Sequence, residues 1–159
     1  MADIFKAQKT MMELMRMYEL NDWKFQYNNC KTSVGGCIAG RKILELSRHY
    51  AQLNSEDDML DTMLHEIAHA LAYLKYGRRV GHDYRWVQIA RAIGSIGERT
   101  AESKNLNRPK ARFVYKCKKC GYERAVHRRF KRRKACYDCC AKYAYGKFDE
   151  RFVMELQRS

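Results

Sequence analysis

The chain has 159 residues, enough for one compact core and a small additional module. Its formal net charge is +14 at pH 7, from 32 Lys and Arg against 18 Asp and Glu. No apolar run reaches the length of about 18 residues that a membrane span requires, and the first twenty residues mix charges with apolar side chains, unlike a secretory signal. We therefore expect an intracellular protein, cytoplasmic or associated with the nucleoid.

The positive charge is concentrated in one segment. Residues 1–107 hold 15 basic and 13 acidic side chains, whereas residues 108–147 hold 15 basic and 2 acidic ones. A polyanion is the natural partner for such a segment. We predict a first domain over residues 1–100, a linker over 101–112, a basic module over 113–147 and a C-terminal tail over 148–159.

The first hundred residues show the patterns of an α+β domain. Apolar residues recur with a helical period over Ala2–Leu20. Alternating apolar and polar residues, with a Gly-Gly turn, then predict a small antiparallel sheet of two or three strands over Trp23–Leu46. Cys30 and Cys37 fall in this region. Because intracellular disulfides are rare, both are predicted to be buried thiols; a second metal site or a redox pair is the alternative.

The strongest helical pattern follows Asn54 and ends near Gly77, which fits a C-terminal cap. Ser55 and Asp58 have the spacing of a capping box, with acidic residues near the positive end of the helix dipole. A third helix is predicted to begin near Asp83. The face of the long helix that turns to the core is predicted to carry Met59, Met63, Ile67, Leu71 and Leu74.

Two histidines of the long helix lie one turn apart in the sequence His65-Glu66-Ile67-Ala68-His69. Positions i and i+4 share nearly the same face, about 6 Å apart along the axis, so both imidazoles can reach one metal ion. Glu66 is offset by about 100° and can act as general base on a metal-bound water. His82, after a turn, is the candidate third ligand. Two buried neutral histidines on a core helix are the alternative.

This arrangement predicts hydrolytic chemistry. Zinc held by three protein ligands keeps a fourth position for water and lowers the pKa of that water to roughly 7. Glu66 would take the proton during attack on a peptide carbonyl and return it to the leaving amine. Ala72 and Lys75 stand where the longer metzincin motif has glycine and histidine, which disfavours that class. A zinc endopeptidase is therefore predicted.

Four cysteines of the basic segment have the spacing of a metal site. Cys117 and Cys120, then fifteen residues, then Cys136 and Cys139 fit a four-thiolate structural zinc site. About forty residues with few aliphatic side chains cannot bury enough surface to fold alone, so metal binding would supply the missing free energy. Cys140 in place of Cys139 is the alternative fourth ligand.

The segment between the two cysteine pairs is basic and is interrupted by Phe130. Basic side chains with interleaved aromatic ones suit phosphate contacts and base stacking on single-stranded or distorted nucleic acid. Base-specific readout is not expected from these residues. A solvated charge run is the alternative. The candidate nucleic-acid-binding residues are Arg124, Arg128, Arg129, Lys131, Arg132, Arg133 and Lys134.

The HEIAHA motif at residues 65–70, Gly81-His82 before an aromatic-bearing helix, and the paired cysteines resemble the SprT-like family. Its best-known members are the Spartan-type proteases of DNA–protein crosslink repair, and the resemblance covers roughly residues 1–145. It implies a helical zincin-like domain followed by a zinc ribbon, one catalytic and one structural zinc ion, and cleavage of proteins on DNA. In this resemblance His65, His69 and His82 bind the catalytic zinc and Glu66 is catalytic.

Two other functions fit the same patterns. The first is a zinc-ribbon regulator that binds nucleic acid and no longer cuts, although metal binding alone would not require Glu66. The second is an ImmA/IrrE-like repressor-cleaving peptidase, which shares HExxH but does not call for the ribbon. For a peptidase, we expect a strand such as Ile43–Ser47 to lie at the sheet edge and to hold substrate by strand addition.

Overall fold

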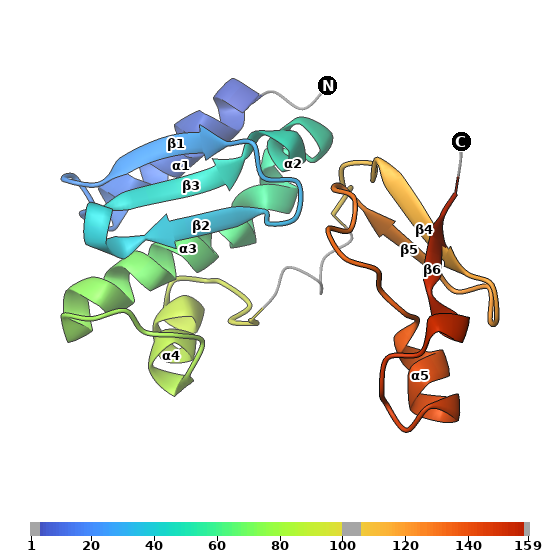
Figure 1. Ribbon diagram of the computed structural model, residues 1–159. Coiled ribbons are helices and arrows are strands. Elements are labelled where there is room, and N and C mark those ends of the chain that lie inside the picture. The colour runs from blue at the N-terminus through green and yellow to red at the C-terminus, as the bar shows by residue number, and fades with distance from the viewer. Residues whose placement is uncertain (1–3, 100–105, 158–159) are drawn as a thin grey trace. The chain divides into compact units, whose positions relative to one another are not determined.

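The computed structural model describes residues 4–99 and 106–157, which form two compact units, Met1–Pro109 and Lys110–Ser159. The boundary falls within the predicted linker over 101–112, of which residues 101–105 lie outside the described part. Both units contain helices and strands (Figure 1), so the α+β class is confirmed. None of the described helices combines the length and apolar character needed to cross a membrane.

The first unit holds a three-stranded sheet and four α-helices. α1 corresponds to the helix predicted over residues 2–20, whose first two residues lie outside the described part. α2 was not predicted, because its six residues are too few to show a period. The elements are α1 (Ile4–Met17), β1 (Lys24–Asn28), β2 (Gly35–Ile38), the 3-10 turn η1 (Ala39–Arg41), β3 (Ile43–Ser47), α2 (Arg48–Leu53), α3 (Glu56–Tyr76) and α4 (Tyr84–Ala92).

The sheet is mixed, and the prediction of an antiparallel sheet was wrong for one of its two pairings. Its strand order is β1-β3-β2, with β3 parallel to β1 and antiparallel to β2. After β1 the chain crosses to the far edge and returns through η1, so β3 is inserted between the other two strands. β3 is therefore the central strand, and the expectation of an edge strand at Ile43–Ser47 was also wrong. Alternation reports which face is buried, but it does not identify the neighbouring strand.

Helices α1 and α3 cover one face of this sheet (Figure 1). The capping box of Ser55 and Asp58 at the start of α3 is confirmed, and Gly77 ends the helix with φ of 64°. Leu74, predicted to face the core, is half exposed, because the buried residues of α3 end at Ala72, two residues earlier. The fully buried side chains of this core include Met11, Leu20, Leu44, Leu46, Met59, Met63 and Ile67.

Helix α4 packs on α3 through small residues and one large side chain. Ala68 and Ala72 of α3 leave room for Trp86 of α4, and all three are fully buried. Asp83 caps α4 by accepting a hydrogen bond from the backbone N–H of Arg85, as the predicted start of this helix requires. This packing fixes the loop between α3 and α4, which carries His82.

The second unit contains a three-stranded antiparallel sheet of order β5-β4-β6 and one α-helix. The expectation of a C-terminal tail over 148–159 was wrong for its described part, because β6 pairs with β4 and Phe152 and Met154 are buried in this unit. A strand of three residues is too short to show alternation. The elements are β4 (Phe113–Cys117), β5 (Glu123–Val126), α5 (Tyr137–Tyr143), the 3-10 turn η3 (Glu150–Phe152) and β6 (Met154–Leu156).

Candidate metal centres

The structure brings the three predicted histidines together. His65 and His69 extend from α3, and His82 reaches them from the loop before α4. The Nε2 atom of His82 lies 3.1 Å from the Nε2 atoms of both other rings. The helix places the first two side chains one turn apart, and the turn after Gly77 returns the chain so that the third meets them.

The histidine cluster (His65, His69 and His82) fits a zinc ion. Tetrahedral coordination at 2.0–2.1 Å separates two ligand nitrogens by about 3.3 Å, close to the observed 3.1 Å. Burial, and then the neighbouring His65 and His82, lower the pKa of His69 to about 3. Its imidazole is therefore neutral at pH 7 and keeps a lone pair for a metal. A hydrogen bond with the backbone of Val80 also orients this ring.

Trp86 packs against all three rings of the histidine cluster. Its ring centroid lies 4.6 Å from those of His65 and His82 and 5.1 Å from that of His69, and its side chain is fully buried. A contact with three rings at once restricts how far any of them can turn. No role at the site was predicted for this residue, although its position four residues after His82 was a signal that it could lie close to that ring.

Glu66 lies beside the cluster and is almost completely buried, with 7% of its surface exposed. Burial, and then the charge of Glu45, raise the pKa of Glu66 to about 8 in the metal-free protein. A cation held by the adjacent histidines would favour the ionised form and lower this pKa. A carboxyl group whose pKa lies close to neutral pH is suited to accept a proton and to return it.

The edge strand β2 contacts Glu66 directly. A Cβ atom at Gly35 would lie 3.0 Å from both Cγ and Oε1 of Glu66 and 3.0 Å from Cγ2 of Thr62. Only a glycine lets the strand and the carboxylate approach so closely. The prediction of a turn at the two glycines was wrong, because Gly35 and Gly36 begin β2.

The histidine cluster and Glu66 line a cavity of about 690 Å³ in the first unit, together with all of β2. Cys37 of β2 lines it too, and burial followed by the charge of Glu66 raises the pKa of this thiol to about 12. Among the described residues, neither Cys37 nor Cys30 forms a disulfide, and both are only partly buried, whereas buried thiols were predicted. Because β2 is an edge strand and lines the same cavity as Glu66, an extended substrate can lie along β2 with its backbone close to Glu66.

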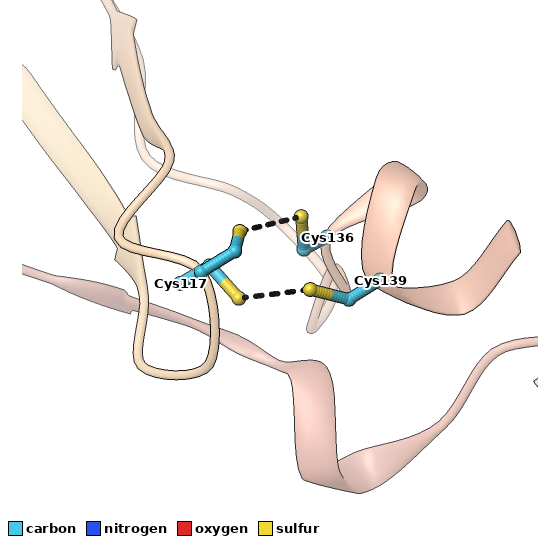
Figure 2. Close-up of side chains that lie close together, drawn as sticks. Cys117, Cys136 and Cys139 are labelled. Atoms are coloured by element: carbon cyan, nitrogen blue, oxygen red, sulfur yellow. Dashed lines mark hydrogen bonds between the residues drawn. The ribbon is translucent and has the colours of Figure 1, made fainter. Parts of the chain in front are cut away.

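The second centre consists of four cysteines from two segments of the second unit. Cys117 ends β4 and Cys120 lies in the turn that follows, whereas Cys136 and Cys139 lie at the start of α5. Figure 2 shows Cys136 and Cys139 beside Cys117. The Sγ atoms of Cys117 and Cys139 are 3.8 Å apart, and those of Cys120 and Cys136 are 3.7 Å apart. Of the two adjacent cysteines, Cys139 is the one that joins the cluster, whereas Cys140 is buried elsewhere in the core of this unit.

The sulfur spacing of this cysteine cluster (Cys117, Cys120, Cys136 and Cys139) fits tetrahedral zinc. Zn–S bonds of about 2.3 Å place two ligand sulfurs about 3.8 Å apart, whereas a disulfide would bring them to about 2.05 Å. The observed 3.7 and 3.8 Å agree with the first value. The chemistry of the donors also points to zinc, because four thiolates favour it over hard, oxygen-seeking cations.

The seven predicted nucleic-acid-binding residues are all exposed on the second unit. Two of them, Arg124 and Lys134, lie 5.7 and 5.2 Å from the centre of the Phe130 ring, and this ring stacks on Tyr115 with centroids 4.0 Å apart. Arg133 is paired with Glu150, which reduces its availability. Tyr137 and Tyr145, which are 81% and 98% exposed, add aromatic faces to the same unit.

The SprT-like family model matches residues 4–107 of the chain. The chain belongs to the SprT-like family. The match covers the helix with the histidines, the loop with His82 and the sheet beside Glu66, and it ends before the cysteine cluster. This family is generally linked to zinc metallopeptidase-like domains. No solved structure matches the chain.

Proposed function

We propose that this SprT-like protein is a zinc-dependent endopeptidase that acts on DNA-associated proteins, as in DNA–protein crosslink repair. The observation that carries the proposal is the convergence of three histidine Nε2 atoms beside a buried glutamate in one cavity. Metal binding alone would not need Glu66. Burying an ionisable carboxyl group costs free energy, and a catalytic role accounts for its presence at this position. A zincin-like fold for the first unit is part of this proposal.

In the proposed mechanism His65, His69 and His82 would hold a zinc ion, and its Lewis acidity would favour a water nucleophile and a polarised substrate carbonyl. Glu66 accepts the proton of that water and then donates it to the leaving amine. The contact of Trp86 with the imidazoles keeps them in place. β2, in place of the strand named from the sequence, holds the substrate backbone by strand addition.

The second unit is proposed to be a zinc ribbon that brings the peptidase to DNA. Its cysteine cluster would bind a structural zinc ion, so that each chain carries two zinc ions. The exposed basic side chains would contact phosphates, and Phe130 with its flanking cations would offer a stacking surface for an unpaired base. DNA affinity should then fall steeply as the salt concentration rises, and salt-independent binding would contradict this account.

The deciding experiment measures cleavage of a DNA-bound protein by the zinc-loaded chain, with and without single-stranded DNA. We expect cleavage that DNA enhances and that Glu66→Gln abolishes while the zinc content stays unchanged. DNA binding without any cleavage would favour the regulator, and cleavage of a free repressor independent of DNA would favour an ImmA/IrrE-like peptidase. Full activity of the Glu66→Gln variant would overturn the general-base role.

A further inference from the structure

Three arginines line the cavity of the first unit around the histidine cluster. Arg79 comes from the loop between α3 and α4, Arg99 follows α4, and Arg108 lies near the end of the unit. All three are exposed, and within residues 4–99 and 106–157 none of them forms an ion pair. We call this group the arginine rim (Arg79, Arg99 and Arg108).

Among the described residues, no side chain that lines the cavity forms an ion pair with the arginine rim. Arg85, in contrast, forms an ion pair with Asp83. Of the described residues that line the cavity, two are acidic: Glu66 is buried beside the histidines, and Asp61 accepts hydrogen bonds from Ser95 Oγ and the backbone N–H of Ile96 at 2.8 and 2.7 Å. The three guanidinium groups thus line a cavity in which Asp61 is engaged by Ser95 and Ile96 and Glu66 is buried beside the histidines.

The rim lies close to the histidine cluster. Arg79 is three residues before His82 in the loop between α3 and α4, and both line the cavity together with Arg99. A ligand that pairs with the rim would thus lie beside the proposed reaction centre.

The shape and chemistry of the cavity favour a peptide carboxylate over a nucleic acid as the ligand. A guanidinium group pairs with a carboxylate through two parallel hydrogen bonds. The cavity also contains the free edge of β2, which suits an extended peptide. Among the described residues that line it, Tyr50 is the one Phe, Tyr or Trp; it is 4% exposed and offers no face on which a base could stack.

We propose that the arginine rim binds a carboxylate of the peptide substrate close to the bond that is cleaved. This inference rests on the proposed peptidase function and adds a substrate preference to it. The carboxylate can belong to an acidic side chain or to the C-terminus of the substrate. The first source would make the enzyme selective for acidic segments, and the second would direct it to chain ends.

The test uses the zinc-loaded full chain with Glu66→Gln, so that bound peptides are not cut. Short peptides of Ala, Ser and Gln, labelled with an uncharged fluorophore, are compared in three forms: one Glu with an amidated C-terminus, no Glu with an amidated C-terminus, and no Glu with a free C-terminus. Fluorescence anisotropy gives each Kd. We expect one carboxylate form to bind about tenfold more tightly than the neutral peptide, as a hydrogen-bonded charge pair allows, and the form that gains affinity identifies the source.

The same measurement is repeated with Arg79→Gln, Arg99→Gln and Arg108→Gln, singly and combined. Arg78→Gln is the matched control, because Arg78 is an exposed neighbour that does not line the cavity. The combined variant should lose the preference, and the control should keep it. Unchanged zinc content and thermal unfolding will show that these exposed substitutions leave the fold intact.

Each other outcome has a defined meaning. Equal affinity for the charged and neutral peptides would overturn the proposal, as would a preference that survives in the combined variant, since the basic second unit would then be the binding site. A rim that binds an oligonucleotide and no peptide would also overturn it. Selective peptide binding without cleavage by the unsubstituted chain would support the rim and refute the peptidase function.

Discussion

The two metal centres rest on cores of different kinds. In the first unit, Met11, Leu44, Met59 and other large apolar side chains form a core that does not include the histidines. In the second unit, four of the seven buried core residues are cysteines, and three of these four belong to the cysteine cluster. The first centre is thus added to a fold that exists without it, whereas the second is a large part of the core that it occupies.

The strongest way to break this comparison is to remove a thiolate. Cys136→Ser should cost the chain one metal ion and unfold the second unit, since zinc contributes on the order of 10 kcal/mol to the folding of small metal modules. Metal analysis and amide hydrogen exchange over residues 113–156 will measure both effects. Cys140→Ser is the control and should keep the metal, because Cys140 lies outside the cluster. Normal protection in the Cys136→Ser variant would refute the structural role.

Removing a histidine should cost the chain a metal ion without unfolding the unit that holds it. His69→Ala should weaken zinc binding at the first centre by more than about 100-fold, because a ligand matters more than the outer groups that orient it. The first unit should nevertheless stay folded. Both Trp residues of the chain, Trp23 and Trp86, belong to this unit, so Trp fluorescence during heating reports on it alone. His49→Ala, outside both clusters, is the control. Unfolding of the His69→Ala variant would make both centres structural.

A smaller effect is expected when the contact between β2 and Glu66 at the first centre is disturbed. Gly35→Ala should destabilise the first unit by about 1–3 kcal/mol, as overpacking does, and should reduce cleavage by displacing the Glu66 carboxylate. Gly36→Ala is the matched control, because its Cβ would come no closer than 3.9 Å to Glu45 Oε2. Chemical denaturation followed by Trp fluorescence, together with cleavage rates, compares the two variants. Equal stability and activity would show that β2 does not constrain Glu66.

The smallest effect concerns the pH dependence of stability. The pKa of Glu66 is raised to about 8 in the folded metal-free protein, from an ordinary value of 4.5. Between these values the folded state retains a proton that the unfolded state loses, so the stability of the first unit falls as the pH rises. Glu66→Gln removes this loss. The Tm of the metal-free variant should exceed that of the metal-free native chain by a few degrees at pH 8 and by less at pH 5; a difference that shrinks with rising pH would contradict it.

Features set by neighbouring residues could be predicted from the sequence. The capping box of Ser55, the helix end at Gly77 and the shared face of His65 and His69 all depend on contacts within a few residues. The spacing of the two cysteine pairs indicated a common site in the same way. Strand order could not be predicted, because a β-strand with one buried face carries the same alternation whether its neighbour is parallel or antiparallel. The short elements α2 and β6 left no periodic signal either.

By itself, the sequence determined which residues are chemically able to form each centre: a pair of imidazoles one helical turn apart with a carboxylate beside them, and four thiols in two short-spaced pairs. The tertiary structure decided how these groups meet. Only the folded chain brings His82 to the other two imidazoles, places the edge strand at Gly35 against Glu66, and gathers Arg79, Arg99 and Arg108 around one cavity. These contacts join residues far apart in the chain, so they depend on how the helices and strands pack and not on local spacing.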